Sequence, residues 1–147
     1  MNINEILLST INSKVILSKS GGSTGSLWLI DFEYKTSFYI YCTWRIEHNN
    51  QVLASSNDDS TAIVGRLTRS VKELEGNKLI SFNLTKQYDL TLCFENDFSV
   101  KVFCDISYSQ TDNGGTYDTN WDISIPDRDL VISINNYFNV IVGKYNS

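Results

Sequence analysis

The sequence Phe38-Tyr-Ile-Tyr-Cys-Thr-Trp-Arg-Ile-Glu47 alternates between two kinds of side chain. Every second position is apolar, and the positions between them are amphipathic or polar. This period of two is typical of a β-strand with one face buried in a core. The segment therefore predicts one strand over 38–47. Its apolar face comprises Phe38, Ile40, Cys42, Trp44 and Ile46.

Segments on both sides of this strand predict further strands joined by short turns. His48-Asn-Asn-Gln51 has the composition of a hairpin turn that returns the chain through 52–55. The sequence predicts about nine strands in all, and such short connections favour an antiparallel sheet. The other strands are expected at 27–32, 79–85, 88–95, 98–105, 121–125, 130–134 and 138–142, and 15–17 is a candidate for one additional short strand.

Two short helices are expected, one before and one after the first hairpin. Residues 2–13 carry apolar side chains at helical spacing, with Asn2 as the N-cap and Glu5 three residues later, as in a capping box. Residues 61–75 form a second apolar stripe, which Gly76 ends. The second helix is expected to cover part of the apolar face of the sheet. This element order predicts an α+β fold, a mainly antiparallel curved β-sheet or a two-layer β-sandwich with two short helices.

Length and charge restrict the class of protein. The chain has 147 residues, which fits a single domain over 1–147. Its net charge is −5, with 12 Lys and Arg against 17 Asp and Glu. Nucleic acids and anionic membrane surfaces are bound chiefly through Lys and Arg, so both are excluded as expected partners. A basic protein is compatible with this charge.

The cysteines and the first residues indicate a cytoplasmic protein. Cys42, Cys93 and Cys104 are odd in number and show no C-x-x-C spacing. This pattern favours buried thiols in a reducing compartment. The alternative is one structural disulfide and one free thiol in a secreted protein. The N-terminal segment has no basic region and carries Glu5, unlike a signal peptide.

No motif predicts catalysis, a cofactor or a metal. The glycine-rich loop at 18–26 lacks the lysine of a Walker A motif after its last glycine, Gly25. His48 lies in a predicted turn, where histidine is usually a solvated surface residue. Residues 112–118 lack the ligand spacing of a calcium loop. Acid–base chemistry would require Asp105, Asp118 and Asp122 to converge, and nothing in the sequence requires that.

Aromatic side chains at positions opposite the expected core are the main candidates for function. Tyrosine and tryptophan supply large contact areas at low entropic cost and concentrate in interfaces. A two-layer structure that buries both faces of its central strands is an equal alternative explanation. Acidic residues at the expected start of the second helix complete the candidate interaction surface. Its residues are Trp28, Tyr39, Tyr41, Asp58, Asp59, Tyr108, Tyr117 and Trp121.

Several short segments carry a resemblance to known proteins. They are Gly65-Arg-Leu, Leu74-Glu-Gly-Asn-Lys-Leu79, Tyr88-Asp-Leu-Thr-Leu-Cys-Phe94 and Val100-Lys-Val-Phe-Cys-Asp105. With Trp121 and the closing hairpin, they resemble a family of small uncharacterised bacterial α+β proteins over about half the chain. Small acidic proteins of this kind are also similar to the immunity proteins that neutralise polymorphic toxins. The resemblance implies a protein-binding, non-catalytic role and assigns no specific residues.

Three functional hypotheses follow from the sequence. The first is a non-enzymatic protein-interaction module, immunity-like, whose partner is another protein such as a basic toxin or a second copy of the chain. The second is a small-ligand-binding domain with a Trp- and Tyr-lined pocket beside the 18–26 loop. The third is an enzyme that uses clustered carboxylates. A flat acidic and aromatic patch would favour the first hypothesis, and a deep pocket would favour the second.

Overall fold

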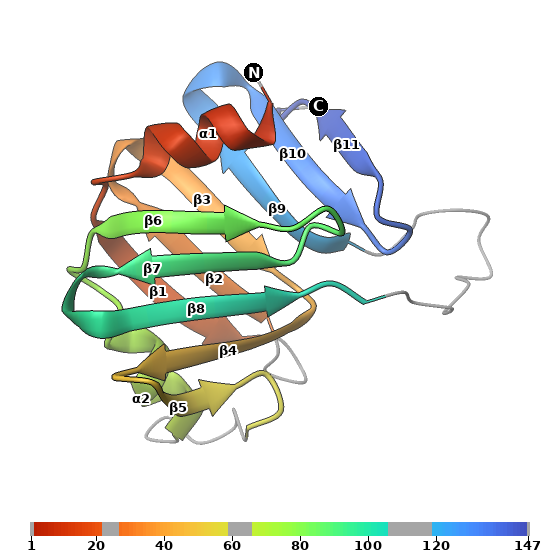
Figure 1. The fold of residues 1–147 in the computed structure, drawn as a ribbon. Coiled ribbons are helices and arrows are strands. Elements are labelled where there is room, and N and C mark those ends of the chain that lie inside the picture. Colours follow the sequence, from red (N-terminus) through yellow and green to blue (C-terminus); the bar gives the residue numbers. More distant parts are fainter. Residues whose placement is uncertain (1, 22–26, 59–65, 106–118, 147) are drawn as a thin grey trace.

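The computed structural model describes residues 2–21, 27–58, 66–105 and 119–146, which form two antiparallel β-sheets packed as two layers. Figure 1 shows the five-stranded sheet in front of the six-stranded sheet, with strands that run in different directions. The described residues contain two α-helices and eleven strands. This arrangement confirms the predicted α+β fold in its two-layer form.

The strand orders follow from a chain that crosses repeatedly between the layers. The six-stranded sheet has the order β1 (Val15–Gly21), β2 (Leu27–Phe32), β3 (Thr36–Ile40), β9 (Thr119–Ile125), β10 (Leu130–Asn135) and β11 (Val140–Gly143). The five-stranded sheet has the order β5 (Gln51–Ser55), β4 (Thr43–His48), β8 (Phe98–Phe103), β7 (Leu90–Phe94) and β6 (Leu79–Leu84). The described connections also contain three single-turn 3-10 helices, at Glu33–Lys35, Glu95–Asp97 and Pro126–Arg128.

The predicted single strand over 38–47 is wrong, because this segment forms β3 in one sheet and β4 in the other. The chain crosses between the layers at Tyr41 and Cys42, whose N–H groups both donate to the Asn120 carbonyl at 2.8 and 3.1 Å. The alternation of side chains continues through the crossing, because both halves bury their apolar residues in the same core. A period of two alone therefore does not reveal the change of sheet.

The core lies between the inner faces of the two sheets and contains all three tryptophans, each fully buried. The rings of Trp28 and Trp44 lie 4.4 Å apart between centroids, and Trp28 Nε1 donates to Ser18 Oγ at 2.8 Å. Trp121 Nε1 donates to the Tyr88 carbonyl at 2.9 Å. The expectation that Trp28 and Trp121 belong to an exposed surface is therefore wrong, since the second layer covers both.

The first helix begins as the sequence predicts. In α1 (Ile3–Thr10), Asn2 Oδ1 accepts a hydrogen bond from the Glu5 N–H at 2.9 Å, and Asn2 Nδ2 donates to Glu5 Oε1 at 3.2 Å. The helix ends before the predicted residue 13, because the Asn12 N–H donates to the Leu79 carbonyl at 2.8 Å. Residues 12–15 thus pair with residues 76–79 and connect the two sheets at one corner.

The second helix closes one side of the sandwich instead of covering a sheet face as expected. α2 (Arg66–Lys72) contacts β1 and β5, the edge strands of the two sheets on that side (Figure 1). Arg66 donates to the Val52 and Leu53 carbonyls of β5 and thereby covers the edge of that strand. The predicted stripe at Leu67, Val71 and Leu74 is buried. The predicted helical residues 61–65 lie outside the described residues.

The structure corrects one further boundary and confirms the conformation of one glycine. The predicted loop at 18–26 begins later, because β1 continues through Gly21 and pairs with β2; residues 22–26 lie outside the described ranges. Gly76 has the predicted left-handed conformation, with φ of +89°. β11 is the edge strand of the six-stranded sheet on the side away from β1, and all four of its residues are exposed.

Candidate interaction surface

The outer face of the six-stranded sheet carries a group of tyrosine and leucine side chains around one carboxylate. The strand register aligns Leu29 with Tyr39 and Tyr39 with Asp122. Directly paired residues project to the same face of a sheet. We call this surface the tyrosine face; it comprises Leu27, Leu29, Tyr39, Tyr41, Asp122 and Tyr145.

The tyrosines stack on one another and remain accessible. The rings of Tyr39 and Tyr41 lie 6.4 Å apart between centroids, with an interplanar angle of 15°. Tyr41 is 44% exposed and Tyr145 is 48% exposed. The Asn146 N–H donates to Asp129 Oδ1 at 2.8 Å and so holds the C-terminal segment against the sheet. A stacked pair of partly exposed tyrosines offers a rigid contact surface.

Asp122 lies in the middle of this face, and no described residue pairs with its charge. Burial raises the pKa of the Asp122 carboxyl to about 6. Among the described residues, no hydrogen bond or ion pair to this carboxylate is found. By contrast, Asp31 on the same face accepts a hydrogen bond from Ser37 Oγ at 2.5 Å. Asp122 is therefore a half-buried carboxylate whose ionised form is poorly solvated in the folded chain.

The tyrosine hydroxyls respond to the same environment. Burial raises the pKa of Tyr41 to about 12, and the nearby Asp122 and Tyr39 contribute to this rise. Burial is also the main cause that raises the pKa of Tyr39. The nearby Asp31, Tyr145 and Asp122 raise it further, in that order. Both hydroxyls stay protonated at neutral pH and remain hydrogen-bond donors. The face thus combines aromatic rings, neutral donors and one desolvated negative charge.

We expect Asp122→Asn to stabilise the protein at neutral pH. The folded chain binds the Asp122 proton more tightly than the unfolded chain, so the ionised carboxylate costs stability as pH rises from about 4 to about 6. The gain from the variant should therefore be near zero at pH 4 and reach about 2–3 kcal/mol above pH 6. Urea unfolding of both proteins across this range measures it. A gain independent of pH would contradict the assignment.

A shallow groove adjoins the tyrosines. It has a volume of about 260 Å³ and is lined by Lys19, Ser20, Gly21, Leu27, Leu29 and Tyr39. Its exposed lining is almost entirely apolar. β1 and β2 form its floor, and Tyr39 of β3 forms one wall. The groove therefore extends the tyrosine face towards the edge of the sheet.

Among the described members of the predicted interaction surface, Tyr39 and Tyr41 are the two that meet on this face. Asp58 lies in the turn after β5, where its Oδ2 accepts a hydrogen bond from the Ser55 N–H at 2.7 Å. Trp28 and Trp121 are in the core. Asp59, Tyr108 and Tyr117 lie outside the described residues.

Sequence reasoning missed three other members of the tyrosine face, Leu27, Leu29 and Tyr145, and considered Asp122 only for acid–base chemistry. Asp122 alternates with Trp121 and Ile123, so the sequence alone could predict that it points outward. The proximity of Tyr39 to Asp122 could not be predicted, because β3 and β9 are far apart in the sequence.

The other residues that were considered for catalysis or metal binding make separate contacts in the described structure. Asp105 Oδ2 accepts a hydrogen bond from Thr43 Oγ1 at 3.2 Å. The His48 ring stacks on Phe98 with centroids 4.1 Å apart. Within the described part of the chain, no three His, Cys, Asp or Glu side chains are grouped so that they could hold a metal ion. Residues 112–118, which include Asp118 and which the sequence does not predict to bind calcium, lie outside the described ranges.

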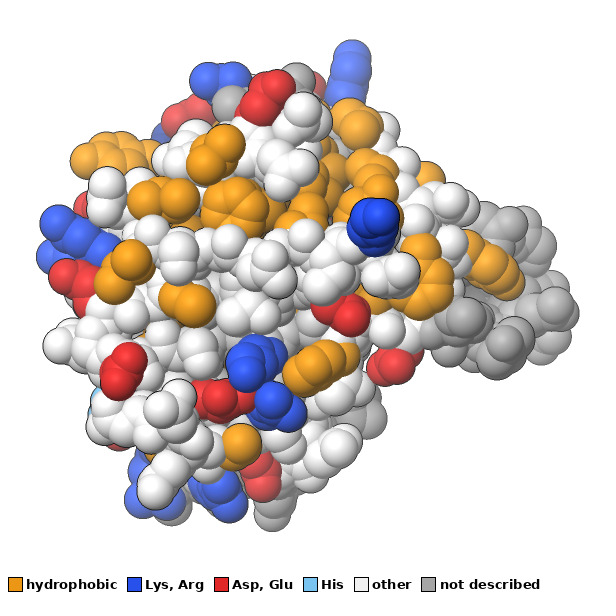
Figure 2. Space-filling model, viewed as in Figure 1, with side chains coloured by type: hydrophobic (Ala, Val, Ile, Leu, Met, Phe, Trp, Pro, Cys, Tyr) orange, Lys and Arg blue, Asp and Glu red, His pale blue; other side chains and the backbone are white. Residues whose placement is uncertain are grey.

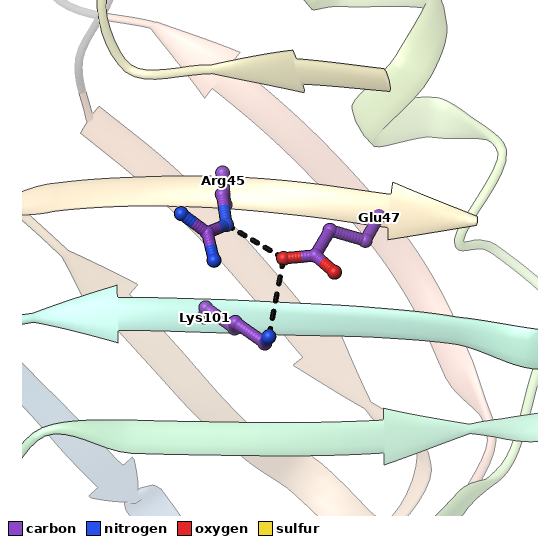
Figure 3. A network of polar contacts seen from close by, with 3 residues as sticks. All are labelled: Arg45, Glu47 and Lys101. Carbon is purple, nitrogen blue, oxygen red and sulfur yellow. Dashed lines mark hydrogen bonds and ion pairs between the residues drawn. The ribbon is translucent and has the colours of Figure 1, made fainter. Parts of the chain in front are cut away.

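The outer face of the five-stranded sheet is polar, and its central charges satisfy one another. Glu47 Oε2 accepts from Arg45 Nε at 2.6 Å and from Lys101 Nζ at 3.3 Å (Figure 3). Burial raises the Glu47 pKa, but the hydrogen bonds from Arg45 and Lys101 outweigh it, so the pKa is lowered. Figure 2 shows acidic and basic side chains close together on this face, with separate hydrophobic side chains beside them. This face therefore offers neither the aromatic surface nor the unpaired charge of the tyrosine face.

Comparison with known proteins provides no further assignment, because no family model, curated protein or solved structure matches this chain. Neither helix within the described ranges has the length and hydropathy needed to cross a bilayer.

Proposed function

We propose that this chain is a non-enzymatic, cytoplasmic bacterial protein-interaction module that binds a basic segment of a partner protein on the tyrosine face. The observation that carries the proposal is the half-buried Asp122 carboxylate beside Tyr39, with no cation paired to it among the described residues. A lysine or arginine side chain of the partner would pair with Asp122 and restore its ionised form.

The tyrosines suit such a cation. A lysine or arginine above the face of a tyrosine ring is attracted by the ring quadrupole, by about 0.5–2 kcal/mol depending on desolvation. Tyrosine is also among the residues that most often carry binding energy at interfaces. The net charge of −5 would speed the encounter with a basic partner. Ring stacking, desolvated charge and net charge thus all favour the same kind of ligand.

This surface is compatible with an immunity-like role towards a basic toxin. An immunity protein of that kind must present a preformed surface that binds quickly and tightly. The tyrosine face meets the first requirement, because β2, β3 and β9 hold its members in one sheet. The acidic net charge supports the second, because electrostatic steering raises association rates.

The groove beside Tyr39 favours a second candidate function, the binding of a small ligand. Its volume of about 260 Å³ is just below the range of about 300–1,000 Å³ typical of ligand pockets. Its lining combines Leu27 and Leu29 with Lys19, whose charge could attract an anion. A ligand that fits would be a small apolar molecule with an anionic group.

A peptide titration distinguishes the two candidates. We expect a short arginine-rich peptide to shift backbone amide resonances of β2, β3 and β9 in NMR spectra of the labelled protein. The same peptide with glutamate in place of arginine should cause no shifts. Shifts confined to β4, β7 and β8 would contradict the proposal. Saturable binding of small apolar carboxylates at Leu27 and Leu29, with no response to the peptide, would favour the second candidate.

We expect Tyr41→Ala to weaken binding of the arginine-rich peptide at least tenfold, or about 1.4 kcal/mol. Removal of the partly exposed Tyr41 ring should leave the fold intact, but it eliminates one of the two stacked rings. Isothermal titration calorimetry measures the effect. The matched control is Tyr34→Ala, because Tyr34 is 81% exposed and lies in the turn between β2 and β3. Equal losses in both variants would exclude the tyrosine face as the site.

A further inference from the structure

Two of the three cysteines face each other across neighbouring strands. The register of β4 and β8 pairs Thr43 with Phe103, so Cys42 and Cys104 occupy the next opposed positions. The Trp44 N–H and carbonyl both bond to Ser56, on the side away from β8. Trp44 and Val102 are therefore a non-hydrogen-bonded pair. Because hydrogen-bonded and non-hydrogen-bonded pairs alternate along an antiparallel ladder, Cys42 and Cys104, two positions further on, are also a non-hydrogen-bonded pair.

The hydrogen bonds of the two cysteines agree with this assignment. The Cys42 N–H donates to the Asn120 carbonyl at 3.1 Å, and the Cys104 N–H donates to Asp89 Oδ1 at 2.7 Å. Non-hydrogen-bonded pairs have Cα atoms about 4.5 Å apart, within the range of about 4.4–6.8 Å that a disulfide spans.

The two thiol groups lie close enough to act on each other. The Cys104 thiol and burial both raise the pKa of Cys42, and the Cys104 S–H donates to the Tyr88 carbonyl at 3.2 Å. Both side chains pack against the core, yet neither is fully buried. A small oxidant can therefore reach the pair without unfolding of the chain.

We propose that Cys42 and Cys104 are a redox-active pair that forms a reversible intrachain disulfide on reaction with a low-molecular-weight disulfide. This inference is independent of the proposed binding function. It assigns the bond to the crossing where the chain passes from β3 to β4, opposite the residue that follows β8.

The reaction is thiol–disulfide exchange in two steps. One cysteine loses its proton to solvent, and its thiolate attacks the oxidant, so that a mixed disulfide forms and one small thiol leaves. The second cysteine then loses its proton and attacks the protein sulfur of the mixed disulfide, and the second small thiol leaves. The protein loses two electrons, which reduce the oxidant to two thiols.

The thiol environment predicts a slow first step. The neighbouring Cys104 thiol, together with burial, raises the pKa of Cys42. A raised pKa leaves little thiolate at neutral pH, and the thiolate is the nucleophile. The exchange should therefore accelerate with rising pH. Once formed, the bond closes a long loop that contains β4 to β8, and we expect it to raise the melting temperature by about 5–10 °C.

Cys93 provides the internal control. It lies in β7 opposite Ser81 and Ser99, on the outer face of the five-stranded sheet. Cys42 and Cys104 share the inner face with Trp44 and Val102. Cys93 should therefore form only mixed disulfides with the oxidant.

The experiment is incubation of the folded, reduced chain with excess glutathione disulfide, followed by alkylation and peptide mapping by mass spectrometry. We expect a linked Cys42–Cys104 peptide pair in the wild type and in Cys93→Ser, each with the raised melting temperature. Cys104→Ser should give neither the linked pair nor the raised melting temperature. A Cys104→Ala variant replaces it if the serine variant does not fold.

Any of three results would overturn the inference. The first is the presence of only mixed disulfides on the folded wild type after prolonged incubation at pH 8.5. The second is a linked pair that involves Cys93. The third is a Cys42–Cys104 link that forms only when urea is present.

Discussion

Trp28→Ala is expected to lower the free energy of unfolding by about 4 kcal/mol, within the usual range for removal of a fully buried tryptophan. The Trp28 side chain is fully buried, and its ring lies against the Trp44 ring. Its removal also leaves Ser18 Oγ without the 2.8 Å hydrogen bond from the indole. A cavity between the two sheets would result, because strands held in ladders relax little.

Urea unfolding followed by circular dichroism measures this effect. Trp28→Phe should lower the free energy of unfolding by less than half as much, since phenylalanine keeps most of the ring contact with Trp44. Tyr41→Ala on the opposite face of the same sheet is the matched control, with an expected change below about 1 kcal/mol. A loss at Trp28 as small as that at Tyr41 would mean that Trp28 is a surface residue, contrary to the two-layer structure.

Asn120→Ala is expected to cost about 3 kcal/mol, the second largest effect, because one side chain holds three backbone groups. Asn120 Oδ1 accepts from the Asp105 N–H at 2.9 Å, and Nδ2 donates to the carbonyls of Asp105 and Asn135, both at 3.1 Å. Asn120 lies beside the crossing from β3 to β4, where Tyr41 and Cys42 bond to its carbonyl, and the residue is 1% exposed. Alanine there would leave polar groups with no partner and little access to water.

The matched control is Asn83→Ala, the same substitution at an exposed position of β6. We expect that change to stay within about 0.5 kcal/mol. Thermal unfolding of both variants at one pH gives the comparison. If Asn120→Ala is as mild as Asn83→Ala, the crossing is held by the backbone bonds from Tyr41 and Cys42 alone.

Local patterns were enough to place most elements. The strand at 27–32 matches β2, and the hairpin turn at Asn49 and Asn50 has positive φ at both residues. The N-cap at Asn2, whose side chain accepts a hydrogen bond from the Glu5 N–H, fixes the start of α1. These features depend on residues close together in the chain, so the sequence shows them directly.

The candidate site was less accessible to sequence reasoning. Tyr39 and Tyr41 were identified from alternation alone, as side chains opposite the apolar positions of their segment. The same reasoning misplaced Trp28 and Trp121, because alternation separates two faces but does not say which face a second layer covers. The pairing of β3 with β9, which puts Asp122 beside Tyr39, joins segments with about eighty residues between them.

Residue order alone set the period of each strand, the helix N-cap, the turns and the acidic charge, because these depend on neighbours along the chain. Long-range pairing set the rest. It divided 38–47 between two sheets, buried the tryptophans and left the Asp122 carboxylate among tyrosines. It also set Cys42 opposite Cys104. Such contacts arise from how two layers share one core, and a core is a property of the whole chain.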